Sequence, residues 1–140
     1  MQVTLGFDTS CYTTSAAAVN GQGEVVAASR MLLPVAKGQR GLRQSEAVFA
    51  HVRQMPLVMA ELQKQLSPME AQVVAVCASS KPRDGADSYM PVFTVGLGHA
   101  SVLSSALNVP LYETSHQRGH IAAGLVGNEE PAGRFVALHL

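Results

Sequence analysis

The periodicity of the apolar residues changes once along this chain, near Ser45, and this change limits the folds that the chain can adopt. Before Ser45, three short segments rich in β-branched and small apolar residues predict strands at 3–7, 13–19 and 24–33. Asn20-Gly21 predicts a type I′ hairpin turn, because both central positions of that turn need a positive φ. The first third of the chain is therefore expected to form a three-stranded antiparallel meander.

After Ser45 the pattern becomes helical and then alternates between strands and helices. A helix is predicted from Ser45, its N-cap, to Leu66, and Pro56 predicts either a kink in it or two abutting helices. Its apolar stripe is expected to consist of Val48, Val52, Met55, Met59, Leu62 and Leu66. Further elements are predicted in this order: a helical turn at 67–70, a strand at 73–78, a helix at 94–107, a strand at 109–112, a helix capped by Ser115 and a last strand at 135–140.

This order predicts an α/β domain with a mixed sheet and helices on its faces. Three meandering strands followed by crossover units resemble the ribonuclease-H-like half of the actin, sugar-kinase and heat-shock ATPase architecture. We expect residues 1–140 to form the first lobe of such a protein. Because the sequence stops inside a predicted strand, we also expect it to be truncated at its C-terminus.

Composition argues against several classes of protein. The 140 residues are 47% hydrophobic, which argues against disorder, but no apolar run reaches the length of a membrane helix. The formal charge is zero, so the chain lacks the basic field of a stand-alone nucleic-acid binder. Cys11 and Cys77 lack CxxC spacing and are expected to be reduced core thiols. We therefore expect a cytoplasmic protein without a membrane partner.

His116 and His120 are the strongest candidates for a functional site. Residues at i and i+4 lie on one face of a helix, and two imidazoles so placed can hold one metal ion. Zinc peptidases that use this spacing have Glu directly after the first histidine, whereas Gln117 stands here and cannot act as a base. A metallopeptidase is therefore the least favoured function, and a chance pair of surface histidines remains the alternative.

A second candidate site directly follows the first predicted strand. Asp8, Thr9 and Ser10 bring a carboxylate, two hydroxyls and backbone amides to the position where actin-like proteins carry a phosphate loop. Asp-Thr-Ser after a strand is also typical of an ordinary turn, so this pattern alone leaves both interpretations open.

Several motifs occur in an order that resembles one family. They are Gly-Phe-Asp-Thr-Ser-Cys at 6–11, Leu-Arg-Gln-Ser-Glu-Ala at 42–47, His-Val-Arg at 51–53, Val-Gly-Leu-Gly-His-Ala at 95–100, Asn-Val-Pro-Leu at 108–111 and Ser-His-Gln-Arg-Gly-His at 115–120. The chain resembles the tRNA threonylcarbamoyladenosine transferases, formerly called O-sialoglycoprotein endopeptidases or glycoproteases.

The resemblance implies that His116 and His120 bind one divalent metal, iron or zinc, which holds threonylcarbamoyl adenylate or another nucleotide. The enzyme would transfer threonylcarbamoyl to N6 of the adenosine beside the tRNA anticodon. Asp8, Thr9 and Ser10 would belong to the loop that faces the nucleotide. In such a mechanism the metal positions the acyl donor and no nucleophilic side chain is needed.

The chain also departs from the family at 12–14, at Arg118 in place of a Glu, and at 79–91 in place of a compact turn, which suggests a divergent bacterial paralogue. The family's second phosphate loop and metal-binding aspartate would follow Leu140. The fragment alone is therefore expected to bind metal weakly and to be inactive. The alternative is a non-catalytic partner or scaffold, acting as a homodimer or a paralogous heterodimer.

Overall fold

The computed structural model describes residues 1–38, 40–128 and 133–138, and it is organised around a five-stranded mixed sheet. The strand order is β3-β2-β1-β4-β5, in which β1 pairs with β2 and β2 with β3 antiparallel, whereas β1–β4 and β4–β5 are parallel. This topology confirms the predicted ribonuclease-H-like mixed sheet. The strands are β1 (Gln2–Thr9), β2 (Thr13–Asn20), β3 (Val25–Leu32), β4 (Gln72–Lys81) and β5 (Leu111–Ser115).

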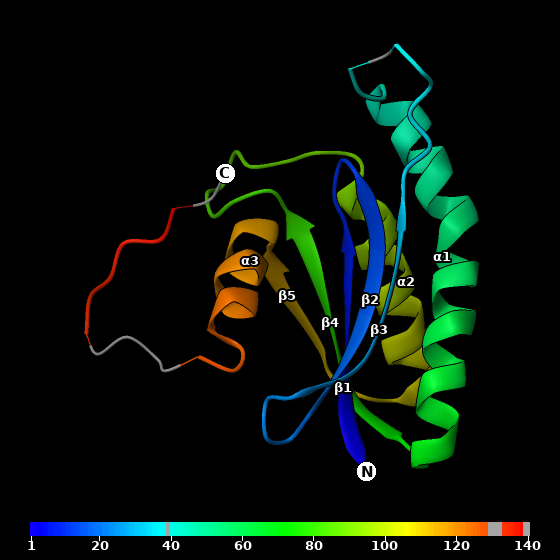
Figure 1. Ribbon diagram of the computed structural model, residues 1–140, viewed down its shortest axis with the longest axis vertical. Coiled ribbons are helices and arrows are strands. Elements are labelled where there is room, and N and C mark those ends of the chain that lie inside the picture. Colours follow the sequence, from blue (N-terminus) through cyan, green and yellow to red (C-terminus); the bar gives the residue numbers. More distant parts are fainter. Residues whose placement is uncertain (39, 129–132, 139–140) are drawn as a thin grey trace.

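Helices cover the two faces of the sheet unequally (Figure 1). Two long helices lie on one face, where α1 contacts β2 and β3 while α2 contacts β1 and β4. The short helix α3 lies on the other face and contacts β4 and β5. In the part of the chain that the structure describes, no helix is long and apolar enough to span a bilayer. The helices are α1 (Gln44–Leu66), the 3-10 turn η1 (Ser67–Met69), α2 (Phe93–Leu107) and α3 (His116–Leu125).

The hydrophobic core lies between the sheet and the two long helices. Side chains alternate along a strand, so the odd-numbered residues of β1, Val3, Leu5 and Phe7, are buried against α1 and α2. From α1, Met55 and Leu62 complete this core with 0% exposure. The even-numbered residues of β1 point to the opposite face, which only α3 partly covers.

The first helix settles one predicted alternative and differs from its prediction in two other respects. It runs as one helix through Pro56, which rules out two abutting helices; Pro56 is exposed, so the carbonyl that loses its helical partner can be solvated. It begins at Gln44 rather than Ser45, and the Arg43 N–H donates to the Glu46 carboxylate over 3.1 Å. The predicted stripe was wrong at Val52, which is 50% exposed, because the buried face includes its polar neighbour His51 instead. That face consists of Ala47, His51, Met55, Val58, Leu62 and Leu66.

The hairpin between β2 and β3 is confirmed, but its predicted turn type was wrong. The positive φ lies at Gly23 (80°) and not at Asn20 or Gly21. The Asn20 side-chain oxygen accepts the N–H groups of Gln22 and Glu24, each over 3.0 Å. This side chain therefore organises a longer connection than the two-residue type I′ turn.

The predicted last strand does not form within the residues that are described. Residues 134–138 have no strand geometry, and Phe135, Val136 and Leu138 are 49%, 97% and 82% exposed. Positions 139–140 of that prediction lie outside the described residues. An apolar run becomes a strand only where a sheet edge accepts its hydrogen bonds, and this segment runs on the side of α3 away from the sheet (Figure 1).

Candidate metal and nucleotide site

The site forms where the three parallel strands β1, β4 and β5 end. Carboxyl ends of parallel strands meet at one edge of a sheet, so Asp8, Ser79 and His116 come together although they are far apart in sequence. The buried Ser115 ends β5 and caps α3, because its hydroxyl accepts the Arg118 N–H over 3.3 Å. This cap, predicted from sequence, starts the helix at His116.

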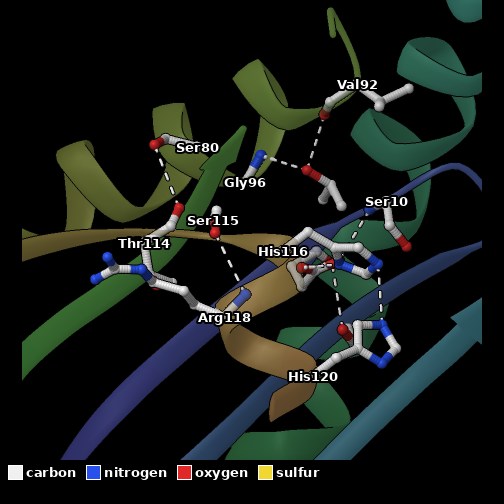
Figure 2. Close-up of polar contacts among 12 residues, drawn as sticks. Ser10, Ser80, Val92, Gly96, Thr114, Ser115, His116, Arg118 and His120 are labelled. Atoms are coloured by element: carbon white, nitrogen blue, oxygen red, sulfur yellow. Dashed lines mark hydrogen bonds and ion pairs between the residues drawn. The ribbon is translucent and has the colours of Figure 1, made fainter. Parts of the chain in front are cut away.

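The two helix histidines face each other at this edge (Figure 2). The Nε2 atoms of His116 and His120 are 2.9 Å apart, and their ring centroids are 4.3 Å apart with an interplanar angle of 79°. Two imidazole nitrogens on one tetrahedral zinc ion lie about 3.3 Å apart when each bond is about 2.0–2.1 Å long. At 2.9 Å the two nitrogens are at the distance of a hydrogen bond between the rings, and a shift of a few tenths of an ångström would let both bind one metal ion.

Asp8 fixes the ring of His116. Its Oδ2 accepts from His116 Nδ1 over 2.8 Å, and its Oδ1 accepts the Ser10 N–H over 3.0 Å. Burial opposes ionisation of Asp8, but hydrogen bonds from His116, Ser79 and the Ser10 amide outweigh it and lower the pKa below the ordinary 3.8. The carboxylate is thus ionised at neutral pH and holds a proton on Nδ1, which directs the Nε2 lone pair of His116 toward His120.

Thr9 has a different role from its neighbours. It lies on the opposite face of β1 with 0% exposure, where its hydroxyl donates to the Val92 carbonyl over 2.8 Å and accepts the Gly96 N–H over 3.0 Å (Figure 2). A Cβ at Gly96 would lie 2.9 Å from this hydroxyl, so a glycine at this position lets α2 come close to the Thr9 side chain. At Gly98 a Cβ would have no such neighbour within 4 Å.

An open cavity of about 810 Å³ lies beside the histidine pair, over the sheet face that α1 and α2 leave uncovered. Small residues, among them Gly6, Ala17 and Ala28, keep the sheet surface low there. The volume falls in the range of about 300–1,000 Å³ that small-molecule sites occupy. Its polar lining includes Asp8, Ser10, Ser15, Arg30, Ser79, Thr114, His116 and His120.

Two of the departures from the family pattern contact each other. Arg118 Nε donates to Asp84 of the 82–92 loop over 2.5 Å, and the Gln117 N–H donates to the Pro82 carbonyl over 3.0 Å. The bond from Arg118 also lowers the pKa of Asp84. The loop thus pairs with the charge of Arg118 and satisfies an amide of the first turn of α3.

The described residues provide two imidazoles but no larger donor set: among them, no group of three or more His, Cys, Asp or Glu side chains could hold a metal ion. The sequence has three further histidines, at positions 51, 99 and 139, and neither of the two that are described joins the pair. His51 is buried and its Nε2 contacts the Ser10 carbonyl, and His99 Nδ1 contacts the Val95 carbonyl over 2.8 Å. His139 lies outside the described residues. The contact between Asp8 and His116 was not predicted from the sequence. The order of the strands could have indicated it, because residues at the ends of parallel strands meet at one edge of the sheet.

The chain is similar to several proteins that share one name. No family model matches the chain. It is 32% identical over 139 residues to a protein of Syntrophobacter fumaroxidans named tRNA N6-adenosine threonylcarbamoyltransferase, covering 97% of this chain and 39% of the relative. A protein of the same name from Geobacillus kaustophilus is 34% identical over 122 residues, covering 85% of this chain and 34% of the relative. The chain thus spans well under half the length of these relatives.

Solved structures support the same fold. YeaZ from Pseudomonas aeruginosa superposes with a TM-score of 0.53 at 20% identity, covering 89% of this chain and 51% of that one. A second structure, of a protein described as similar to peptidase YEAZ from Pseudomonas aeruginosa, gives a TM-score of 0.50 at 20% identity. At this identity the likeness concerns the fold.

Proposed function

We propose that this chain, which is similar over most of its length to proteins named tRNA N6-adenosine threonylcarbamoyltransferase, supplies the first half of a metal-dependent transferase site. One observation carries the proposal: His116 and His120 face each other at one point while Asp8 orients His116. The two imidazole nitrogens lie 2.9 Å apart, close enough for one ion to bind both after a small shift. A carboxylate behind a ligating histidine is the usual support of a metal site.

In this proposal the two Nε2 atoms are metal ligands and Asp8 is a positioning residue. By keeping the proton of His116 on Nδ1, Asp8 keeps Nε2 available to the metal. A divalent ion bound there would act as a Lewis acid and orient the acyl donor. Two imidazoles are fewer than the four ligands of a tetrahedral ion, so this chain alone should bind metal weakly.

The cavity beside the pair is the proposed place of the nucleotide part of the substrate, a threonylcarbamoyl adenylate. Asp8 and Ser10 line it, whereas Thr9 does not. Of the two predicted loop hydroxyls, only that of Ser10 is thus placed to meet a phosphate. Asp8 is occupied by His116, which limits its repulsion of an anion. The acceptor would be the adenosine of a tRNA, which implies work in the cytoplasm.

A non-catalytic role as partner or scaffold of such an enzyme is the second candidate. It is favoured by the small donor set of the described residues, which bring two imidazoles together but no group of three or more ligating side chains. Transfer of threonylcarbamoyl from its adenylate to tRNA separates the two: catalysis by the full-length protein that depends on His116 supports the transferase, and activity indifferent to His116 supports the scaffold.

Metal binding tests the proposal directly. Titration of the chain with Zn²⁺ or Fe²⁺ should show one site that is lost in the His116→Ala, His120→Ala variant. His99→Ala is the matched control, because His99 is an exposed helix histidine remote from the pair in the sequence. Equal metal affinity in the wild-type chain and the double variant would remove the metal site from the proposal.

A further inference from the structure

His51 is the one buried histidine among the described residues, and the proposed metal site does not use it. It has 0% exposure although imidazole is polar, so its partners must satisfy both ring nitrogens. Nε2 is 2.7 Å from the Ser10 carbonyl, and Nδ1 is 2.7 Å from the Thr14 hydroxyl. The side chain thus ties α1 to both ends of the connection between β1 and β2.

The contact with Ser10 leads to the candidate site. The Ser10 carbonyl accepts from His51, and the Ser10 N–H donates to Asp8 Oδ1. The other oxygen of that carboxylate, Asp8 Oδ2, accepts from His116. A series of short hydrogen bonds therefore joins the buried face of α1 to the histidine pair. A carboxylate held on both oxygens has one orientation, and Ser10 supplies one of those two hydrogen bonds.

We propose that His51 is a positioning residue of the candidate site, which holds the Ser10 carbonyl through its Nε2 proton and so keeps Asp8 aimed at His116. A carbonyl can only accept, so the contact requires the proton to lie on Nε2. A ring protonated only on Nδ1 would leave the Ser10 carbonyl without a donor, so the proposal requires a proton on Nε2.

The surroundings of His51 limit how its protons can be placed. The Gln54 amide donates to the Leu32 carbonyl over 2.9 Å, which turns the Gln54 oxygen toward the Thr14 hydroxyl, 2.8 Å away. Thr14 has one proton and can give it either to Gln54 or to His51 Nδ1, so a ring protonated on Nε2 alone shares this donor with Gln54. A ring that also carries a proton on Nδ1 would donate to Thr14 and leave the Thr14 proton to Gln54. In both forms Nε2 donates to the Ser10 carbonyl.

Charged groups near the ring are few. From β1, Asp8 acts on His51 through its charge; β2 presents the uncharged Thr14, α1 the amide of Gln54, and the loop the Ser10 carbonyl. Burial lowers the pKa of His51, while the bond to Ser10 and the charge of Asp8 raise it less, so the neutral ring is the form present near pH 7.

A pair of substitutions separates positioning from mere filling of space. In His51→Gln the amide nitrogen stands near the place of Nε2 and can still donate to Ser10, whereas the shorter side chain of His51→Asn reaches only toward Thr14. Amide exchange of Ser10, measured without metal, should stay near the wild-type rate in the Gln variant and become at least about tenfold faster in the Asn variant. Equal exchange in the two variants would overturn the proposal.

The effect on metal affinity rests on the proposed function and is measured separately by Zn²⁺ titration. We expect about tenfold weaker binding in His51→Asn, the lower end of the loss seen for supporting residues of metal sites, and within about threefold of wild type in His51→Gln. If the wild-type chain binds no Zn²⁺, the proposed function fails while the exchange measurement still decides the role of His51. Affinity that falls only as the folded fraction falls contradicts positioning.

A third measurement needs no variant and so covers the case in which both fail to fold. Nitrogen NMR of the wild-type ring at neutral pH reports which nitrogen carries the proton. A proton on Nε2 that exchanges slowly with water supports the proposal. A proton found on Nδ1 alone would contradict it, because the Ser10 carbonyl would then have no donor.

Discussion

The two faces of the sheet show how one strand can serve both stability and chemistry. On the face beneath α1 and α2, β1 contributes Val3, Leu5, Phe7 and Thr9, all at 4% exposure or less. On the face shared with α3, the same strand contributes Thr4, Gly6 and Asp8 to an open cavity. The packed face stabilises the fold by burying apolar side chains. The open face carries the polar side chains of the candidate site. Substitutions on the two faces should therefore change different observables.

The largest effect is expected in the packed face. Leu62→Ala removes a side chain with 0% exposure and leaves a cavity between α1 and the sheet, which should lower the free energy of unfolding by about 2–5 kcal/mol. Leu57→Ala, on the same helix but 59% exposed, is the control and should change it by less than about 1 kcal/mol. Denaturant unfolding measures both. Similar losses in the two variants would contradict the assignment of the buried face.

The junction between β1 and α2 should respond to a single methyl group. In Gly96→Ala the new Cβ meets the Thr9 hydroxyl at 2.9 Å, so we expect a loss of about 1–3 kcal/mol in unfolding free energy. Gly98→Ala is the matched control in the same helix, where nothing lies within 4 Å and higher helix propensity should add up to about 1 kcal/mol. Thermal or denaturant unfolding measures both changes in unfolding free energy. A change of the same sign in the two variants would contradict the close contact at Gly96.

On the open face the expected effect is on binding. Asp8→Asn keeps the shape of the side chain but removes the charge that holds the His116 proton, so Zn²⁺ affinity should fall about 10–100-fold. Asp87→Asn, an exposed acidic residue of the 82–92 loop, controls for the change in net charge. Calorimetric titration is the measurement. An unchanged affinity in Asp8→Asn would show that Asp8 does not support the pair.

Buried His51 should make stability depend on pH. Because burial lowers its pKa below the ordinary 6.5, the unfolded chain binds more protons there, and the stability contributed above pH 6.5 is lost as pH falls through the folded pKa. The slope attributable to one proton is at most about 1.4 kcal/mol per pH unit. Denaturant unfolding between pH 7 and 5 should show this slope in the wild type and less of it in His51→Gln. A slope of equal size in both would assign it to other groups.

The smallest effect is expected at the surface contact between α3 and the 82–92 loop. Arg118 and Asp84 are 70% and 51% exposed, so the loss of their ion pair in Arg118→Gln should change Zn²⁺ affinity by less than about threefold. Arg118→Glu places two carboxylates together and should weaken binding more, and Asp84→Lys in the same chain should restore it. Failure of this charge reversal to restore affinity would mean that the contact does not position α3.

The sequence alone determined the local structure and the strongest part of the site. Apolar periodicity predicted the order of all five strands and the three main helices, the serine cap placed α3, and the i, i+4 spacing placed His116 and His120 on one face. These features depend on hydrogen bonds and contacts within a few residues. The predicted strand at 135–140 failed over its described part, because a strand also needs a partner edge that no local pattern supplies.

Only the tertiary structure decided how distant residues meet. Asp8 and His116 are 108 positions apart and touch because β1, β4 and β5 run parallel and end at one edge. Thr9 looked equivalent to Asp8 in the sequence, yet the two-residue period of a strand turns it into the core. Arg118 stood in the sequence only as a departure from the family pattern, and the fold gives it Asp84 as a partner. Contacts of this kind follow from strand pairing, which periodicity indicates only in outline.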